Sequence, residues 1–157
     1  ARSVKAVLAS HDDTTRDDVA ASAAFGVKVA EFPTTIDAAE ECRQNGQFII
    51  MGAPNIVRGQ SHSGNVAAHD LAQANLLDIL SSDYIPASLL IGAVKLGQTL
   101  NSLCKGLQSV TSAPADATGL TDRGRLSVGK RADIVRFRLH DQMPIVGSVF
   151  CGGLQVA

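Results

Sequence analysis

The chain has 157 residues, of which 45% are hydrophobic and 18% are charged, and its net charge is -1. This composition predicts one globular domain with a core and excludes a disordered chain. The near-neutral charge argues against general nucleic-acid binding, and the 4% aromatic content without Trp argues against a stacking platform for single strands.

Cysteine usage and hydropathy indicate the cellular compartment of the protein. Cys42, Cys104 and Cys151 are odd in number and far apart, which indicates neither a disulfide framework nor a thiolate zinc site. We therefore interpret them as small core side chains in a reduced, cytoplasmic protein. No apolar run approaches the roughly 20 residues of a membrane helix, so no membrane contact is expected. The chain starts without Met and enters a strand at once, which suggests a piece of a larger protein.

Strands and helices are expected to alternate over most of the chain. Strands are predicted over 4–9, 27–32, 48–53 and 76–82, and helices over 16–25, 34–44, 66–74 and 87–100. Thr34, with Asp37 three residues later, predicts the start of the second helix. This order is typical of a parallel sheet or barrel, which we assign to residues 1–107. Residues 108–157 are interpreted as a connecting segment and a small all-β unit, with strands over 132–137 and 146–151.

Two residues at predicted strand ends are candidates for chemistry. His11 follows the first strand and is interpreted as a metal ligand or a general base, or else as a structural His bound to a loop. Asp83 follows the fourth strand and is interpreted as a metal ligand or a proton acceptor, or else as the cap of the next helix.

The stretch "PNIVRGQSHSGN" after the third strand is predicted to be a polar loop. Arg58 offers a guanidinium fork for phosphate oxygens, and it is accompanied by the further polar side chains of Ser61, His62, Ser63 and Asn65. The alternative is that Ser61 or Ser63 only caps the helix that follows. A second basic stretch, "DRGRLSVGKRAD", is interpreted as a solvated charged surface rather than an anion site.

Several long motifs are shared with a known family. "LASHDDTT", "VAEFPTT", "MGAPNIVRGQSHSGN", "DILSSDYIPASLL" and "PADATGLTDRGRLSVGKRADIVRF" together resemble the C-terminal half of the phosphonate-metabolism members of the amidohydrolase superfamily. The motifs "RGQSHSGN" and "LSSDYIPASLL" are long and specific. The motif that ends in "GKRADIVRF" is shared more widely in the superfamily.

The resemblance implies the C-terminal part of a metal-dependent (β/α)8 barrel of the TIM type, with a small β-sandwich segment beside it. It implies that His11, at the end of the sixth strand, binds a divalent metal, with zinc as the expected ion by the family's usage. It further implies that Asp83, at the end of the eighth strand, binds metal and takes the proton of the attacking water. The activity implied is hydrolysis of alpha-D-ribose 1-methylphosphonate 5-triphosphate to the 5-phosphate and diphosphate.

The same resemblance places the remaining metal ligands N-terminal to this sequence. The reaction is therefore expected of the whole protein, and this chain alone is expected to be inactive. Its expected partners are a phosphorylated small molecule, the N-terminal part of the same protein and a second copy in a homo-oligomer. Two other hypotheses stay open: another cyclic amidohydrolase or deaminase, and a non-catalytic half-barrel that pairs with another chain.

Overall fold

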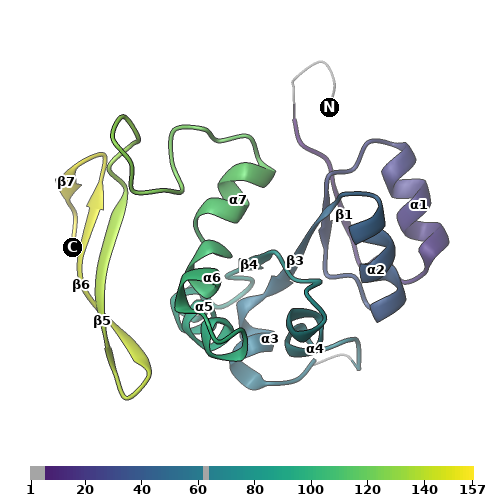
Figure 1. The fold of residues 1–157 in the computed structure, drawn as a ribbon, viewed down its shortest axis with the longest axis horizontal. Coiled ribbons are helices and arrows are strands. Elements are labelled where there is room, and N and C mark those ends of the chain that lie inside the picture. The colour runs from purple at the N-terminus through teal and green to yellow at the C-terminus, as the bar shows by residue number, and fades with distance from the viewer. Residues whose placement is uncertain (1–5, 62–63) are drawn as a thin grey trace.

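The computed structural model describes residues 6–61 and 64–157, and it contains a parallel sheet, an antiparallel sheet and seven helices in that part of the chain (Figure 1). The parallel sheet consists of β1 (Ala9–His11), β2 (Val29–Glu31), β3 (Phe48–Gly52) and β4 (Ile79–Ser81). The antiparallel sheet consists of β5 (Ile134–His140), β6 (Met143–Cys151) and β7 (Leu154–Gln155). The helices are α1 (Arg16–Ala24), α2 (Ile36–Gln44), α3 (Ala53–Arg58), α4 (Ala68–Gln73), α5 (Ser88–Thr99), α6 (Leu103–Gln108) and α7 (Ser112–Ala117). The predicted α/β class is confirmed.

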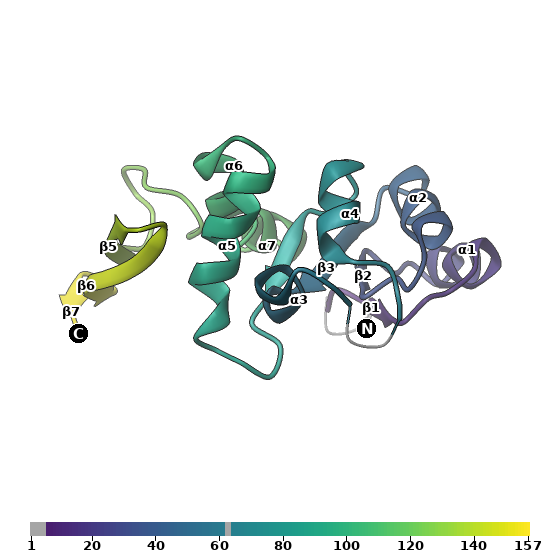
Figure 2. The same cartoon turned by 90° about the horizontal axis from the view of Figure 1, so that it is seen from below.

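The strand order of the parallel sheet follows the chain. Its order is β1-β2-β3-β4, and each strand is parallel to its neighbours. Helices cross from each strand to the next, and Figure 2 shows α2 and α4 along one side of the strands. Because the strands are parallel, all four carboxyl ends lie at one edge of the sheet, which is where barrels of this type hold their active sites.

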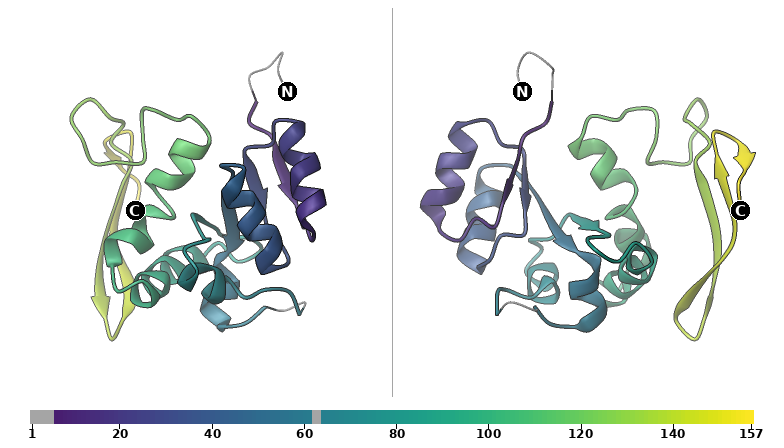
Figure 3. Two further views of the ribbon diagram at one scale, coloured as in Figure 1. Left: turned by 45° about the vertical axis from the view of Figure 1, so that its right-hand side comes forward. Right: turned by 180° about the vertical axis from the view of Figure 1, so that it is seen from behind.

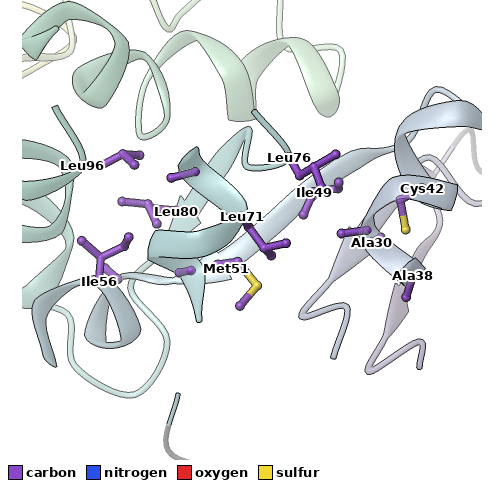
Figure 4. Close-up of a cluster of buried hydrophobic side chains, with 14 of the residues drawn as sticks. Ala30, Ala38, Cys42, Ile49, Met51, Ile56, Leu71, Leu76, Leu80 and Leu96 are labelled. Atoms are coloured by element: carbon purple, nitrogen blue, oxygen red, sulfur yellow. The ribbon is translucent and has the colours of Figure 1, made fainter. Parts of the chain in front are cut away.

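Alternate residues of the strands point to one face of the sheet, and the helices pack against them there. Ala30, Ile49, Met51 and Leu80 share one buried cluster with side chains from α1 to α5 (Figure 4). The helix residues of this cluster are Val19, Ala38, Ala39, Cys42, Ala53, Ile56, Ala68, Leu71, Ala72 and Leu96. This apolar face fixes the register, because a slip by one residue would turn every one of these strand residues to the other face.

The opposite face of the parallel sheet carries a smaller cluster. Val29 and Ile79 are buried there with Ala117 of α7, and Phe48 and Ile50 pack against them. Helix α7 therefore covers part of the face that points away from α1 to α5. In a closed barrel this face of the sheet points to the barrel axis. Helix α7 covers the apolar amino-terminal ends of the strands on this face and leaves their polar carboxyl ends open.

Most of the predicted element boundaries were wrong by one or more residues, and two of these differences bear on the sheet edge. Thr35, not Thr34, caps α2, and its Oγ1 accepts a hydrogen bond of 3.1 Å from the Ala38 nitrogen. The first strand was expected over 4–9, but pairing with β2 covers Ala9 to His11. Residues 4 and 5 of that expected strand lie outside the described residues. His11 is therefore the last residue of β1 rather than a loop residue after it.

The C-terminal third contains the expected all-β unit. It is a three-stranded antiparallel sheet with an irregular register between Arg136 and Phe137, and Figure 3 shows it at the end of the molecule opposite α1. The expected boundary at residue 107 falls inside α6. Because α7 packs on β2 and β4, we propose a boundary after Ala117.

Burial corrects part of the cysteine interpretation. Cys42 is fully buried in the core, and burial raises the pKa of its thiol to about 11. Cys104 and Cys151 are exposed and are not core side chains. Within the described residues, no helix has the length and apolar character that crossing a membrane requires.

Helices α5 and α6 approach each other through glycines. A Cβ at Gly106 would overlap the backbone oxygen of Ala93 and would lie 2.5 Å from the nitrogen of Gly97. Both of these atoms belong to the backbone of α5, which cannot rotate away as a side chain tip can.

We therefore expect Gly106→Ala to destabilise the protein by roughly 1–3 kcal/mol, since overpacking forces the two helices apart. The measurement is the free energy of unfolding from denaturant titration. Lys105→Ala, which changes the exposed neighbour on the same helix, is the matched control and should cost little. A Gly106→Ala protein as stable as the wild type would contradict the close approach of these helices.

Candidate functional site

Backbone strain marks the carboxyl edge of the parallel sheet. Asp12 follows β1 with φ = 60°, Phe32 follows β2 with φ = 58°, and Asp83 follows β4 with φ = 51°. Non-glycine residues in this left-handed region cost roughly 1–3 kcal/mol each and gather at functional sites. Sheet-like hydrogen bonds hold two of them in place, from the Asp12 nitrogen to the Glu31 oxygen at 3.0 Å and from the Phe32 nitrogen to the Ile50 oxygen at 2.9 Å.

These three strained residues surround a cavity of about 150 Å³. Arg58, Ser61, Asn65 and Asp83, four of the residues predicted from sequence, also line it. The remaining lining residues are Pro33, Met51, Gly52, Pro54, Asn55, Gln60, Val66 and Tyr84. His62 and Ser63 lie outside the described residues. The structure therefore brings the described candidate anion-binding residues, Arg58, Ser61 and Asn65, into one pocket with the candidate catalytic carboxylate of Asp83.

Arg58 does not lie in a loop, which corrects the prediction for the stretch after β3. Residues Ala53 to Arg58 form α3, and Arg58 occupies its last turn. Pro54 stands in the first turn, where a missing N–H costs nothing, and Gly59 ends the helix with φ = 82°. Although this stretch is rich in polar residues, it contains the residues that typically start and end a helix. The helix fixes Arg58 more firmly than a loop would.

Asp83 does not act as a helix cap. The residue before α5 is Ala87, and it makes no side-chain capping bond. Asp83 stands instead in the turn between β4 and α5, where the Ile85 nitrogen donates to the Ser82 oxygen at 3.1 Å. Its carboxylate lies close to Gly52 at the end of β3, since a Cβ on Gly52 would be 2.9 Å from Asp83 Oδ2. The structural alternative for Asp83 is therefore wrong, and its side chain faces the pocket.

His11 is half-exposed beside the pocket rather than in its lining. Its Nδ1 lies 3.0 Å from Asp12 Oδ2, and its ring meets the Phe32 ring edge-on at 5.3 Å. Metal-binding histidines are commonly oriented by such a carboxylate on one nitrogen, with the other nitrogen facing the metal. The donor chemistry of His11 and Asp83 thus fits a divalent metal.

The number of metal donors in this chain is incomplete. Among residues 6–61 and 64–157, no group of three or more His, Cys, Asp or Glu side chains is placed to hold a metal ion. A zinc site takes about four ligands. His11 and Asp83 also stand three strands apart, a span of roughly 14 Å along a flat sheet. Their convergence on one ion stays a prediction that depends on barrel curvature.

The strand numbers implied by the family resemblance need one correction. They placed His11 on the sixth strand and Asp83 on the eighth, which leaves one strand between them. The sheet has two strands, β2 and β3, between β1 and β4. If Asp83 follows the eighth strand, His11 ends the fifth. Since His11 keeps its place at the carboxyl edge, this changes its position around the barrel and not its candidate role.

Sequence reasoning missed two residues that line the pocket. Asp12 was not among the candidates; it does not cap α1, which Thr15 caps, and it pairs with His11 instead. Tyr84 was passed over, although it is the only Tyr in the chain and directly follows Asp83. The ring of Tyr84 lies 5.8 Å from the guanidinium carbon of Arg58. A lone Tyr beside a candidate catalytic carboxylate was the signal that could have identified it.

The basic stretch near the C-terminus is a charged surface, as predicted. Three of its arginines form ion pairs of 2.7–2.9 Å with neighbouring carboxylates. These pairs are Arg123 with Asp122, Arg125 with Asp116, and Arg131 with Asp133. The ion pairs hold the pKa of Asp116 and of Asp122 below the usual range of an Asp. These arginines are thus engaged by acidic side chains, which leaves the pocket at the sheet edge as the better anion site.

No protein-family model matches the chain. The alpha-D-ribose 1-methylphosphonate 5-triphosphate diphosphatase of Escherichia coli (strain K12) is 50% identical to it over 158 residues, an alignment that covers 99% of this chain and 42% of that protein. The chain therefore spans less than half the length of this curated relative.

Solved structures share the fold at lower identity. A prolidase solved with N-methylphosphonate-L-proline has a TM-score of 0.74 at 18% identity, over 99% of this chain and 46% of that one. A beta-aspartyl dipeptidase from Fervidobacterium islandicum AW-1 has a TM-score of 0.59 at 16% identity, over 82% of this chain and 38% of that one. An adenine deaminase has a TM-score of 0.55 at 16% identity, over 81% and 44%. The chain therefore has the fold of the C-terminal part of an α/β barrel, which it shares with these solved structures, and it is similar over its length to the diphosphatase of Escherichia coli (strain K12).

Proposed function

We propose that the protein hydrolyses the triphosphate of alpha-D-ribose 1-methylphosphonate 5-triphosphate, with a divalent metal, and releases diphosphate in phosphonate catabolism. The observation that carries the proposal is one pocket that joins Arg58 to Asp83, in a chain 50% identical to the diphosphatase. Arg58 favours an anionic phosphate over the neutral amide of a cyclic amidohydrolase substrate. We further propose a cytoplasmic enzyme, whose activity needs residues beyond those of this chain.

In this proposal His11 and Asp83, together with donors outside this chain, would hold the metal, with zinc as first candidate. A divalent ion would supply Lewis-acid polarisation and a water of lowered pKa. Asp12 orients the His11 ring through the 3.0 Å contact to Nδ1. Asp83 accepts the proton of the water as its oxygen attacks the phosphorus nearest the ribose. The bond from that phosphorus to the bridging oxygen breaks, and the bridging oxygen leaves with diphosphate.

Arg58 binds the departing phosphates in this scheme. Its guanidinium can donate two parallel hydrogen bonds to phosphate oxygens, which a Lys cannot do. Ser61 and Asn65 line the same pocket and supply further polar contacts, and His62 and Ser63 are proposed to contribute as well. Charge grows on the diphosphate as it leaves, so Arg58 stabilises the transition state more than the bound substrate.

The first prediction from this scheme concerns Arg58. We expect Arg58→Lys to lower kcat/KM roughly 10- to 1000-fold, if about 1.5–4 kcal/mol of charge-assisted bonding is lost. Folding should be unchanged, because Lys keeps the positive charge that suits the last turn of α3. Steady-state kinetics with the ribosyl triphosphate, beside a thermal melt, measure both effects.

The matched control is Arg138→Lys, which makes the same change at an exposed position of β5. Unaltered kinetics in Arg58→Lys would remove Arg58 from the site. Lost activity together with a collapsed melting temperature would make Arg58 structural instead.

The second prediction concerns Gly52. We expect Gly52→Ala to leave the fold intact, because the new methyl group meets the rotatable tip of Asp83 and no backbone atom within 3.5 Å. The carboxylate must turn away, and a misplacement of roughly 1 Å can cost about 100-fold in rate. Activity and bound metal should both fall. In an Asp83→Asn background, Gly52→Ala should then change the metal content no further, whereas full activity of Gly52→Ala alone would sink the idea.

The third prediction concerns the metal. A protein limited to residues 1–157 should bind zinc weakly, since its two proposed ligands are fewer than a zinc site requires. Zinc titration with a competing chelator indicator measures the affinity. His11→Ala and Asp83→Ala should weaken what binding there is. Tight stoichiometric zinc, abolished by changing residues of this chain, would show that the chain holds a complete site.

A further inference from the structure

Arg58 has an unusual partner for an arginine of this chain. Its guanidinium carbon lies 5.8 Å from the centroid of the Tyr84 ring. Arg16, Arg43, Arg123, Arg125 and Arg131 each lie within ion-pair distance of a carboxylate. Among the described residues, Arg58 has no such carboxylate. An aromatic face attracts the cation without occupying its N–H groups, so these stay available to an anion in the pocket.

Tyr84 is held in place by the turn between β4 and α5. The buried Ser88 at the start of α5 closes that turn, since its nitrogen and its Oγ donate to the Ile85 oxygen at 2.9 and 2.7 Å. The Ser88 Oγ also lies 3.4 Å from the Ser82 oxygen. The strained φ of 51° at Asp83 sets the direction in which the chain enters Tyr84. Consecutive residues of one turn therefore carry the candidate catalytic carboxylate and the ring beneath Arg58.

The ring of Tyr84 is not part of the hydrophobic core. The residue is 57% exposed, so it contributes little to the core. Both Tyr84 and Arg58 line the pocket, and they reach it from different elements, Arg58 from the end of α3 and Tyr84 from the turn after β4. The contact therefore bridges two βα units at the carboxyl edge of the sheet.

We infer that Tyr84 is a positioning residue for Arg58, whose ring holds the guanidinium over the pocket so that its two-pronged face meets the oxygens of a phosphate chain. This inference rests on the proposed function. An unsupported arginine would sample many rotamers and would lose that freedom on binding, whereas one stacked on a ring is already ordered. Because the same turn carries Asp83 and Tyr84, it links the position of the carboxylate to the binding of diphosphate by Arg58.

The test uses the complete, metal-loaded protein and two readouts. The first is binding of inorganic diphosphate, the proposed leaving group, by calorimetry, and the second is steady-state kinetics with the ribosyl triphosphate. Tyr84→Leu removes the ring and keeps an apolar side chain of similar reach. Tyr84→Phe keeps the ring and removes the hydroxyl. Each change is also made in an Arg58→Ala background.

We expect Tyr84→Leu to weaken diphosphate binding by roughly 2- to 5-fold, as an exposed cation–π contact predicts, and to raise KM by a similar factor. Tyr84→Phe should restore the wild-type values, because the ring face is intact. In the Arg58→Ala background, Tyr84→Leu should have no further effect on either readout. The thermal melts of all variants should agree within a few degrees.

The outcomes separate the inference from the proposed function. A Tyr84→Leu protein that binds diphosphate as the wild type does overturns the inference alone, and so does an equal loss with and without Arg58, which would mean that Tyr84 acts without Arg58. Failure of Tyr84→Phe to restore binding would assign the effect to the hydroxyl and would also overturn it. A wild-type protein that neither binds diphosphate nor hydrolyses the ribosyl triphosphate would overturn both.

Discussion

The parallel register of four short strands is the constraint on which the site depends. Register partners run straight across the sheet, for example Ile50 opposite Ile79 and His11 opposite Glu31. Residues separated by more than 70 positions in the sequence, such as His11 and Asp83, consequently come to the same edge. The register itself is set by the apolar residues that face the helices, because a shift by one residue would place Ile49, Met51 and Leu80 on the wrong face. The core thus determines where the polar residues stand.

The carboxyl edge shows how such a sheet prepares a site. Three of its four strands are followed by a residue with positive φ that is not glycine, and all three residues line the pocket. The strain there is held by hydrogen bonds that extend the sheet and by buried side chains such as Ser88. The remaining strand, β3, ends in Gly52, whose missing side chain leaves room for the carboxylate of Asp83. Rigid support of this kind is what positions catalytic groups with the accuracy that catalysis needs.

Helix α3 illustrates a conflict between composition and local signals. The stretch from Pro54 to Asn65 is rich in polar residues, and a polar loop was the reasonable interpretation. The helix forms because Pro54 and Gly59 provide its ends and because Ala53 and Ile56 are buried against α5 and the sheet. Only six residues long, it could not persist alone and depends on that packing. Its functional consequence is that Arg58 stands on a short fixed element opposite Tyr84.

The sequence by itself determined the alternation of strands and helices, the α/β class, the family resemblance, and the choice of Arg58, Ser61, Asn65 and Asp83 as candidate site residues. Apolar periodicity and strand-end polarity are local properties, and they can be read from neighbouring letters. The tertiary structure alone decided which strand end lies beside which, and it alone decided the contact of Arg58 with Tyr84. These features depend on packing between segments distant in the chain, where close approaches such as that of Asp83 to Gly52 select one arrangement and are not visible in the local sequence pattern.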